Sequence, residues 1–242
     1  MIPISDENPA ELRPVITIAL LLLNVYAWFA LQGAGAPGAL EASVIHFGAI
    51  PCEITGACRA EGLTTGTLLT SMFMHGSWEH ILGNMLFLWV FGNNIEDSMG
   101  HLRFLVFYLL CGLLAGAAHI GFNLASQLPA VGASGAISGV MGAYIVLYPR
   151  ARVRMWFPPI FFFHLRAVWF LAYWFLSQAA MAYIAVGNEA AESGGVAVWA
   201  HVGGFVAGVA LVKVFENRML TRARRAHVQL TPAEVARTRP WM

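Results

Sequence analysis

Three segments far apart in the sequence carry residue types that can perform acyl transfer. Ser134 lies in a glycine-rich run, His201 lies in the last apolar segment, and His80 and Asn84 lie in an earlier one. A serine hydroxyl becomes an effective nucleophile when a neighbouring base removes its proton, and histidine suits that task near neutral pH. Ser134 is therefore the candidate nucleophile and His201 its candidate base. His80, Asn84 and the Ser134 amide are candidate donors to an oxyanion.

The elements that position these residues must lie in a membrane. Of the 242 residues, 58% are hydrophobic and only 11% are charged, which is too little polar surface for a soluble domain of this size. The net charge of +1, without a basic stretch interleaved with aromatics, gives no indication of a nucleic-acid partner. We expect an all-α polytopic protein whose surroundings are the lipid bilayer.

Five apolar runs are long enough to cross about 30 Å of hydrocarbon as helices. They are Val15 to Leu31, Trp78 to Ile95, Leu102 to Leu124, Ala167 to Val186 and Val196 to Val214. A sixth, shorter run lies between Pro129 and Pro149. The prediction is a single membrane domain over 1–242, with a polar segment at 1–14, six spans over 15–214 and a basic tail at 215–242.

The short span predicts where Ser134 lies. Pro149 disfavours helix in the residue before it, so a helix from Gly135 to Tyr148 covers only about 21 Å and cannot cross the bilayer. Irregular backbone at that depth is tolerated only where it is buried in protein or lines a wet cavity. Ser134 should therefore lie at the floor of a water-accessible pocket that opens outward.

The other candidate residues fall in the same layer. We count depths along ideal helices from inner boundaries taken at Pro149, Lys213 and Glu96. Ser134 then lies at about 22 Å, His201 and Asn84 at about 18 Å, and His80 at about 24 Å. His80 and Asn84 are four residues apart and so share one helix face. Close packing of the spans would bring serine and histidine together, and small residues permit it. The small residues assigned to this packing are Gly132, Gly135, Gly139, Gly204 and Gly208.

Other chemistries fit less well. Glu79 is the only acid near this layer, at the outer lip of its span, so we expect a Ser-His dyad and no triad. His75 and His80 are about 140° apart around a regular helix, and there is no H-E-x-x-H, so no metal site is expected.

Cys52 and Cys58 flank a Thr-Gly pair in an outer loop. A disulfide between them is a hypothesis, since sequence does not show whether their Cβ atoms converge.

The distribution of arginine and lysine predicts the orientation. These residues concentrate in the segment that follows the short span and after the last span, whereas Arg59 is the only one in an outer loop. By the positive-inside bias, both termini are cytoplasmic. The polar, acidic opening and the absence of a small-residue cleavage site predict no removable signal peptide, and no Arg-rich transit peptide is evident. We expect a bacterial inner-membrane protein.

These motifs resemble the rhomboid family of intramembrane serine proteases. The resemblance runs over nearly all six spans, from the segment His75 to Asn84, through Gly132-Ala133-Ser134-Gly135, to Ala200-His201-Val202-Gly203-Gly204. It implies a Ser134/His201 dyad, an oxyanion hole that uses His80 and Asn84, and cleavage of transmembrane protein substrates near their outer ends. It also implies that neither metal nor ATP is needed as a cofactor.

Two features depart from the family pattern, and two other functions compete. Ser138 stands where some members have an aromatic residue under the histidine, and the first outer loop lacks a Trp-Arg pair.

A catalytically inactive rhomboid relative that binds membrane proteins is the nearest alternative, although such relatives typically lack the serine or the histidine. A small transporter is the other, but there is no inverted repeat and no acid deep in a span to couple an ion.

Overall fold

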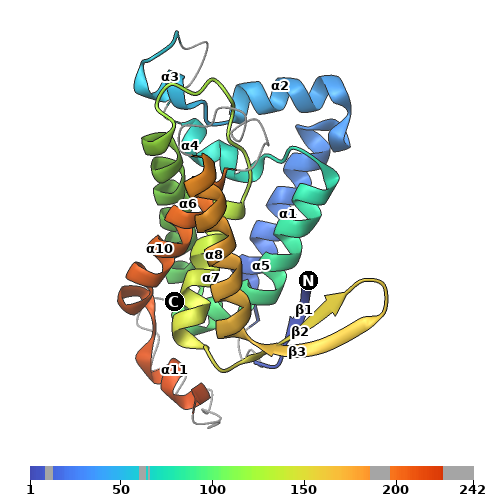
Figure 1. Ribbon diagram of the computed structural model, residues 1–242, viewed down its shortest axis with the longest axis vertical. Coiled ribbons are helices and arrows are strands. Elements are labelled where there is room, and N and C mark those ends of the chain that lie inside the picture. Colours follow the sequence, from blue (N-terminus) through green and yellow to red (C-terminus); the bar gives the residue numbers. More distant parts are fainter. Residues whose placement is uncertain (9–12, 60–63, 65, 186–196, 226–242) are drawn as a thin grey trace.

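Six helices run side by side through the molecule (Figure 1). The computed structural model describes residues 1–8, 13–59, 64, 66–185 and 197–225. The six helices are α1 (Val15–Ala30), α5 (Trp78–Met99), α6 (His101–Phe122), α7 (Ser134–Leu147), α8 (Ala167–Ala185) and α10 (Val198–Phe215). They begin and end close to the predicted bounds. Val186 and Val196, where two predicted spans end and begin, lie outside the described residues.

Three of these helices are long and apolar enough to cross a membrane. Within the described part of the chain, α6, α8 and α10 meet both criteria, while α1 and α7 are shorter apolar helices. Helix α5 has 22 residues but carries more polar side chains. The mostly helical character predicted from composition is confirmed, and the apolar helices are consistent with a membrane protein. The 14 residues of α7 agree with the short helix predicted before Pro149.

Helix α7 forms the centre of the bundle. It packs against α5, α6, α8 and α10, and most of its side chains are buried. Its contact with α10 is a contact between backbones: a Cβ added to Gly204 would lie 2.0 Å from the carbonyl oxygen of Gly135, and one added to Gly208 would lie 1.9 Å from that of Gly139. Any larger residue at these positions would push the helices apart.

One end of the bundle is covered by short helices between α1 and α5 (Figure 1). These are η1 (Gly33–Gly35), α2 (Pro37–Phe47), α3 (Pro51–Thr55), α4 (Thr67–Thr70) and η2 (Ser71–Phe73). The structure joins Cys52 and Cys58 in a disulfide. Gln32 connects this region to the segment that precedes α5. Its amide oxygen accepts the His75 N–H at 2.8 Å, and its amide nitrogen donates to the His75 carbonyl at 2.7 Å.

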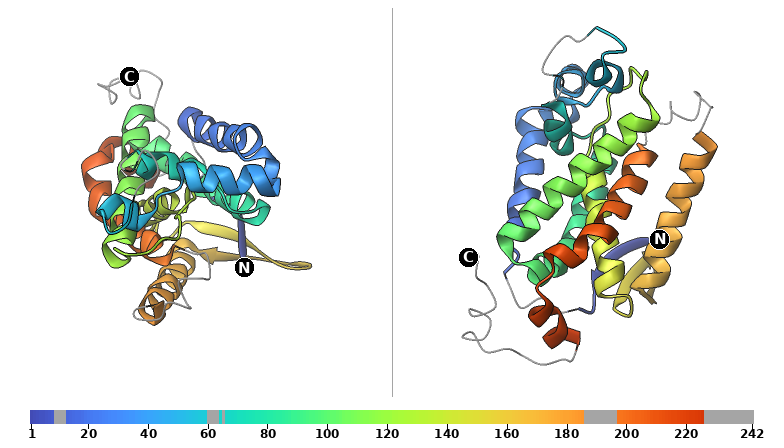
Figure 2. Two further views of the ribbon diagram at one scale, coloured as in Figure 1. Left: turned by 90° about the horizontal axis from the view of Figure 1, so that it is seen from above. Right: turned by 90° about the vertical axis from the view of Figure 1, so that its left-hand side faces the viewer.

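The opposite end carries a small sheet, so the all-α prediction is wrong in this respect. Strands β1 (Ile2–Asp6), β2 (Arg152–Phe157) and β3 (Phe161–Arg166) pair antiparallel in the order β1-β2-β3. The alternation of arginine with Val153 and Met155 in β2 is a strand pattern, and both apolar side chains are buried. Figure 2 shows the β2–β3 hairpin extending away from the bundle. Helix α11 (Arg218–Arg225) lies at the same end.

Helix α5 extends beyond Glu96, the residue from which the depths of Asn84 and His80 were counted. The helix continues to Met99, and the Glu96 carboxylate is fully buried. It accepts the backbone N–H groups of Ile16 and Thr17 and the Thr17 hydroxyl, at 2.7 to 2.9 Å, and lies 2.5 Å from His101 Nδ1. A carboxylate with this many donors can be buried, because the hydrogen bonds replace those lost to water.

Candidate active site

Ser134 is the first residue of α7, and its position follows from the backbone before it. Gly132 has φ +126°, a backbone conformation that residues other than glycine rarely adopt. Its N–H donates to the Ser71 carbonyl at 2.8 Å. The chain then turns directly into the helix. The Ser134 N–H is at the helix N-terminus, where backbone donors have no intrahelical acceptor and the helix dipole favours negative charge.

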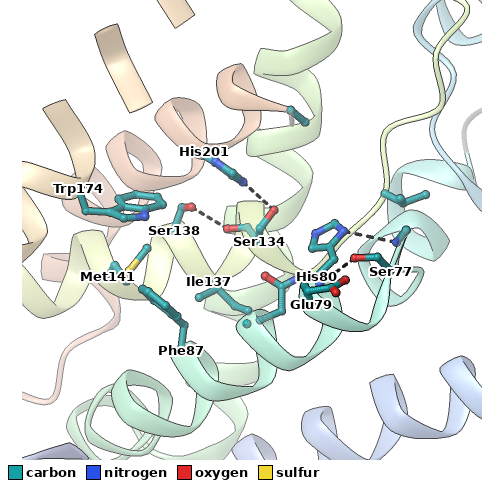
Figure 3. Close-up of a pocket in the computed structure, with 15 residues that line it drawn as sticks. Ser77, Glu79, His80, Phe87, Ser134, Ile137, Ser138, Met141, Trp174 and His201 are labelled. Carbon is teal, nitrogen blue, oxygen red and sulfur yellow. Dashed lines mark hydrogen bonds between the residues drawn. The ribbon is translucent and has the colours of Figure 1, made fainter. Parts of the chain in front are cut away.

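His201 on α10 reaches Ser134 on α7. The distance between His201 Nε2 and Ser134 Oγ is 2.8 Å, within hydrogen-bonding range (Figure 3). The contact depends on the close approach of α7 and α10 at Gly204, one turn after the histidine, because that residue touches the backbone of Gly135. Two residues 67 positions apart therefore meet with the geometry that a nucleophile and its base require.

A third residue, which the sequence analysis missed, contacts the other ring nitrogen. His201 Nδ1 lies 2.7 Å from the side-chain oxygen of Gln178 on α8. One turn earlier on the same helix, the Trp174 ring lies beside the imidazole, with 5.7 Å between ring centroids. The sequence did contain a signal, because Gln178 is a large polar residue in an apolar span, where polar side chains usually have partners.

The serine and the histidine open onto a cavity of about 570 Å³. Side chains from α5, α7, α8 and α10 line it, and Figure 3 shows that the Ser134 and His201 side chains meet between the Trp174 and His80 sides of the cavity. Apolar residues such as Phe87, Ile137 and Met141 form much of the wall. The volume is within the range of small-molecule and peptide side-chain sites.

His80 and Asn84 line the same cavity and present hydrogen-bond donors to it. Among the described residues, the Asn84 side-chain nitrogen is buried without a partner. The Gly76 N–H donates to His80 Nδ1 at 3.4 Å, so the neutral ring carries its hydrogen on Nε2. A Cβ added to Gly132 would lie 2.7 Å from His80 Nε2 and 3.5 Å from the Asn84 nitrogen. Both donors thus lie against the backbone that leads into Ser134.

His75 lies behind His80 and is not part of α5, which begins at Trp78. The two imidazoles meet edge to face, with centroids 5.2 Å apart. Burial, and secondarily the proximity of His80, lowers the pKa of His75 to about 3. His75 is therefore neutral at physiological pH and adds no charge near the donors.

Ser138 is turned toward its own helix. Its hydroxyl donates to the Ser134 carbonyl at 2.6 Å. The aromatic contact that some rhomboids make from this position comes here from Trp174 on α8. The departure from the family pattern therefore leaves the His201 ring with an aromatic neighbour.

The known proteins that this chain resembles are all described as rhomboid proteins. Residues 64–218 match the family model described as the Rhomboid domain. The chain is 33% identical over 140 residues to rhomboid protease GluP of Bacillus subtilis, covering 57% of this chain and 26% of that protein. It is 34% identical over 98 residues to the human presenilin-associated rhomboid-like protein, mitochondrial, covering 40% and 26% of the two chains. Rhomboid protein 1, mitochondrial, of Saccharomyces cerevisiae is 29% identical over 98 residues, covering 39% and 28%. The matched segments thus span about a quarter of each relative's length.

Proposed function

The chain belongs to the rhomboid family of integral membrane proteins, whose members are typically serine proteases, and we propose that it is an active intramembrane serine endopeptidase. Its substrates would be the transmembrane segments of other membrane proteins. The observation that carries the proposal is the 2.8 Å contact between Ser134 Oγ and His201 Nε2, in a cavity that is also lined by the buried, unpartnered side-chain nitrogen of Asn84. An inactive relative would not need to maintain this contact.

The first step would be acylation of Ser134. As its oxygen attacks the scissile carbonyl, His201 Nε2 accepts the hydroxyl proton. The carbonyl oxygen becomes an oxyanion, which the Ser134 N–H, His80 Nε2–H and the Asn84 amide would stabilise. The imidazolium then gives its proton to the leaving amine as the peptide C–N bond breaks. Water, activated by the same imidazole, would hydrolyse the ester and restore Ser134.

The membrane arrangement is part of the proposal. All six helices α1, α5, α6, α7, α8 and α10 would cross or enter the bilayer, with both termini cytoplasmic. The clustered arginines at the sheet end of the bundle support this orientation, since Arg152, Arg154 and Arg166 are all in β2 and β3. The pocket would then open near the outer face, where it would cut substrates near their outer ends. The proposed location is a bacterial inner membrane.

The test is active-site labelling combined with cleavage, both in detergent and in liposomes. A serine-directed fluorophosphonate should label the wild type, and Ser134→Ala and His201→Ala should each abolish labelling and cleavage of a transmembrane substrate. Because the two residues act as a unit, the double variant should be scarcely worse than either single one. A folded Ser134→Ala protein that still cuts would refute the proposal, as would inhibition of the wild type by a chelator. A wild type that neither labels nor cuts would favour the inactive-relative alternative.

A further inference from the structure

Gln178 is the only residue among those described for which a contact with His201 Nδ1 is seen, and its position determines what the imidazole can do. The neutral ring has one N–H and one lone pair, on different nitrogens. For His201 to accept the Ser134 proton at Nε2, the hydrogen must be on Nδ1. The side-chain oxygen of Gln178, 2.7 Å from Nδ1, accepts a hydrogen bond only from that tautomer.

From this geometry we infer that Gln178 is a positioning residue, which holds His201 in the tautomer and ring orientation needed for general-base catalysis. The inference rests on the proposed function and adds a third member to the Ser134/His201 dyad. Gln178 acts through His201 and does not touch the serine. Gln178 is well fixed in place, because only 8% of the residue is exposed and it lies one turn from Trp174, whose ring lies beside the same imidazole.

A neutral amide has a different effect from the carboxylate found in many serine hydrolases. It fixes the tautomer but supplies no charge to stabilise the imidazolium that forms during attack. Replacing Gln178 by glutamate would keep the acceptor oxygen and add that charge. Since an anion near an imidazole favours its protonated form, the pKa of the base in the glutamate variant should rise.

The test measures kcat, KM and the pH profile of kcat/KM for two variants of Gln178. Gln178→Leu removes the acceptor at similar size, so kcat should fall by about 10- to 100-fold with KM little changed, and fluorophosphonate labelling of Ser134 should slow by the same factor. Gln178→Glu should retain most activity, with the acidic limb of kcat/KM moved to higher pH. Tyr173→Leu is the matched control on the same helix. The Tyr173 side chain is exposed on the surface of the bundle, so this substitution should change neither kcat nor the pH profile.

Two outcomes would overturn the role of Gln178. One is a Gln178→Leu protein with wild-type kcat. The other is a Gln178→Glu protein with an unshifted pH profile, which would make Gln178 a packing residue, and this measurement remains decisive if the leucine variant does not fold. Ser134→Ala run in parallel separates the two failures: if it is inactive while both Gln178 variants behave as wild type, only the positioning role is wrong. If Ser134→Ala still cuts, the proposed function itself fails.

An independent observation concerns the β2–β3 hairpin, whose two faces differ in chemistry. Alternate residues of β2 share a face with their partners across the ladder, so Val153, Met155 and Phe157 lie with Phe163 and Phe161. Val153 and Met155 are buried against the helix bundle. Farther along the same face, 53% of Phe157 and 64% of Phe161 are exposed. The apolar face therefore continues beyond the part that packs on the bundle.

The opposite face carries basic side chains nearer the bundle, namely Arg152, Arg154, His164 and Arg166, and the aromatic pair Trp156 and Phe162 at the projecting end. The Arg154 guanidinium lies 5.2 Å from the centre of the Phe162 ring, and the Glu7 carboxylate lies 3.4 Å from His164. We propose that the projecting end of the hairpin lies in the bilayer interface, with Phe157 and Phe161 against the acyl chains and the arginines at the level of the anionic head groups. The hairpin would then fix the height of α7 and α8, the helices that it joins.

Depth-dependent quenching tests this placement without reference to activity. A fluorophore would be attached to Phe161→Cys or, as the matched site on the opposite face, to His164→Cys, in phosphatidylethanolamine and phosphatidylglycerol nanodiscs. The probe at 161 should be quenched severalfold more by acyl-chain spin labels than the probe at 164, and aqueous iodide should show the reverse order. Equal iodide quenching at both sites would place the hairpin in water and overturn the proposal.

Discussion

At Gly204, α10 touches the backbone that follows Ser134, the proposed nucleophile, so this residue offers a quantitative test of how the site is built. In Gly204→Ala, the new Cβ would lie 2.0 Å from the Gly135 carbonyl oxygen and 3.3 Å from Ala115 Cβ. Backbone cannot move aside as a side chain does, so α7 and α10 must separate by at least about 1 Å to reach an ordinary contact distance. Ser134 and His201 are on these two helices, and their 2.8 Å contact would be lost.

The expected cost falls mainly on catalysis. Overpacking of this kind destabilises a core by about 1–3 kcal/mol, which is less than the total stability of a typical folded protein. A displacement of about 1 Å of a nucleophile from its base reduces turnover by roughly 10²-fold. Gly204→Ala should therefore remain folded in detergent by size exclusion and circular dichroism, yet show roughly 10²-fold slower substrate cleavage and Ser134 labelling.

The control is Gly121→Ala on α6, where a Cβ would meet nothing within 4 Å. This variant should keep wild-type activity and gain slightly in stability, by up to about 1 kcal/mol, because alanine is the better helix former. If Gly204→Ala cuts substrate within a factor of a few of the wild type, the helices have adjusted without separating. The claim that this glycine contact sets the Ser134–His201 distance would then be wrong.

Three further predictions concern other parts of the molecule. Asn84→Ala removes one of several proposed oxyanion donors, so cleavage should fall by roughly 10²-fold or less, and an unchanged rate would show that Asn84 has no such role. Cys52 and Cys58 should take up no alkylating reagent until a reductant is added, after which intact mass should rise by two adducts; adducts on both without reductant would contradict the disulfide. Cysteines placed at the exposed Arg152 and Arg222 should react with impermeant reagents only from the cytoplasmic side, and labelling from outside intact cells would reverse the proposed orientation.

Much of the helical framework could be predicted because it depends on local physics. Comparing the length of each apolar run with the thickness of the bilayer located the helices to within a few residues. Pro149 predicted where the short α7 ends. Similar counting placed Ser134, His201, His80 and Asn84 in one layer, because helix rise is constant. The structure brings these four residues to one cavity. Helix α5 extends about one turn beyond Glu96, and a difference of one turn changes the counted depth of Asn84 and His80 only slightly.

What only the tertiary structure decided is which side chains meet across helices. The contact between Gln178 and His201 depends on how α8 turns about its axis, and the burial of Glu96 depends on donors from α1 and α6; neither follows from spacing within one segment. The three-stranded sheet likewise requires β1, at the start of the chain, to meet β2 some 150 residues later. Sequence alone determines the periodicity and depth of each element, whereas the rotation and pairing of elements result from the packing of the whole chain.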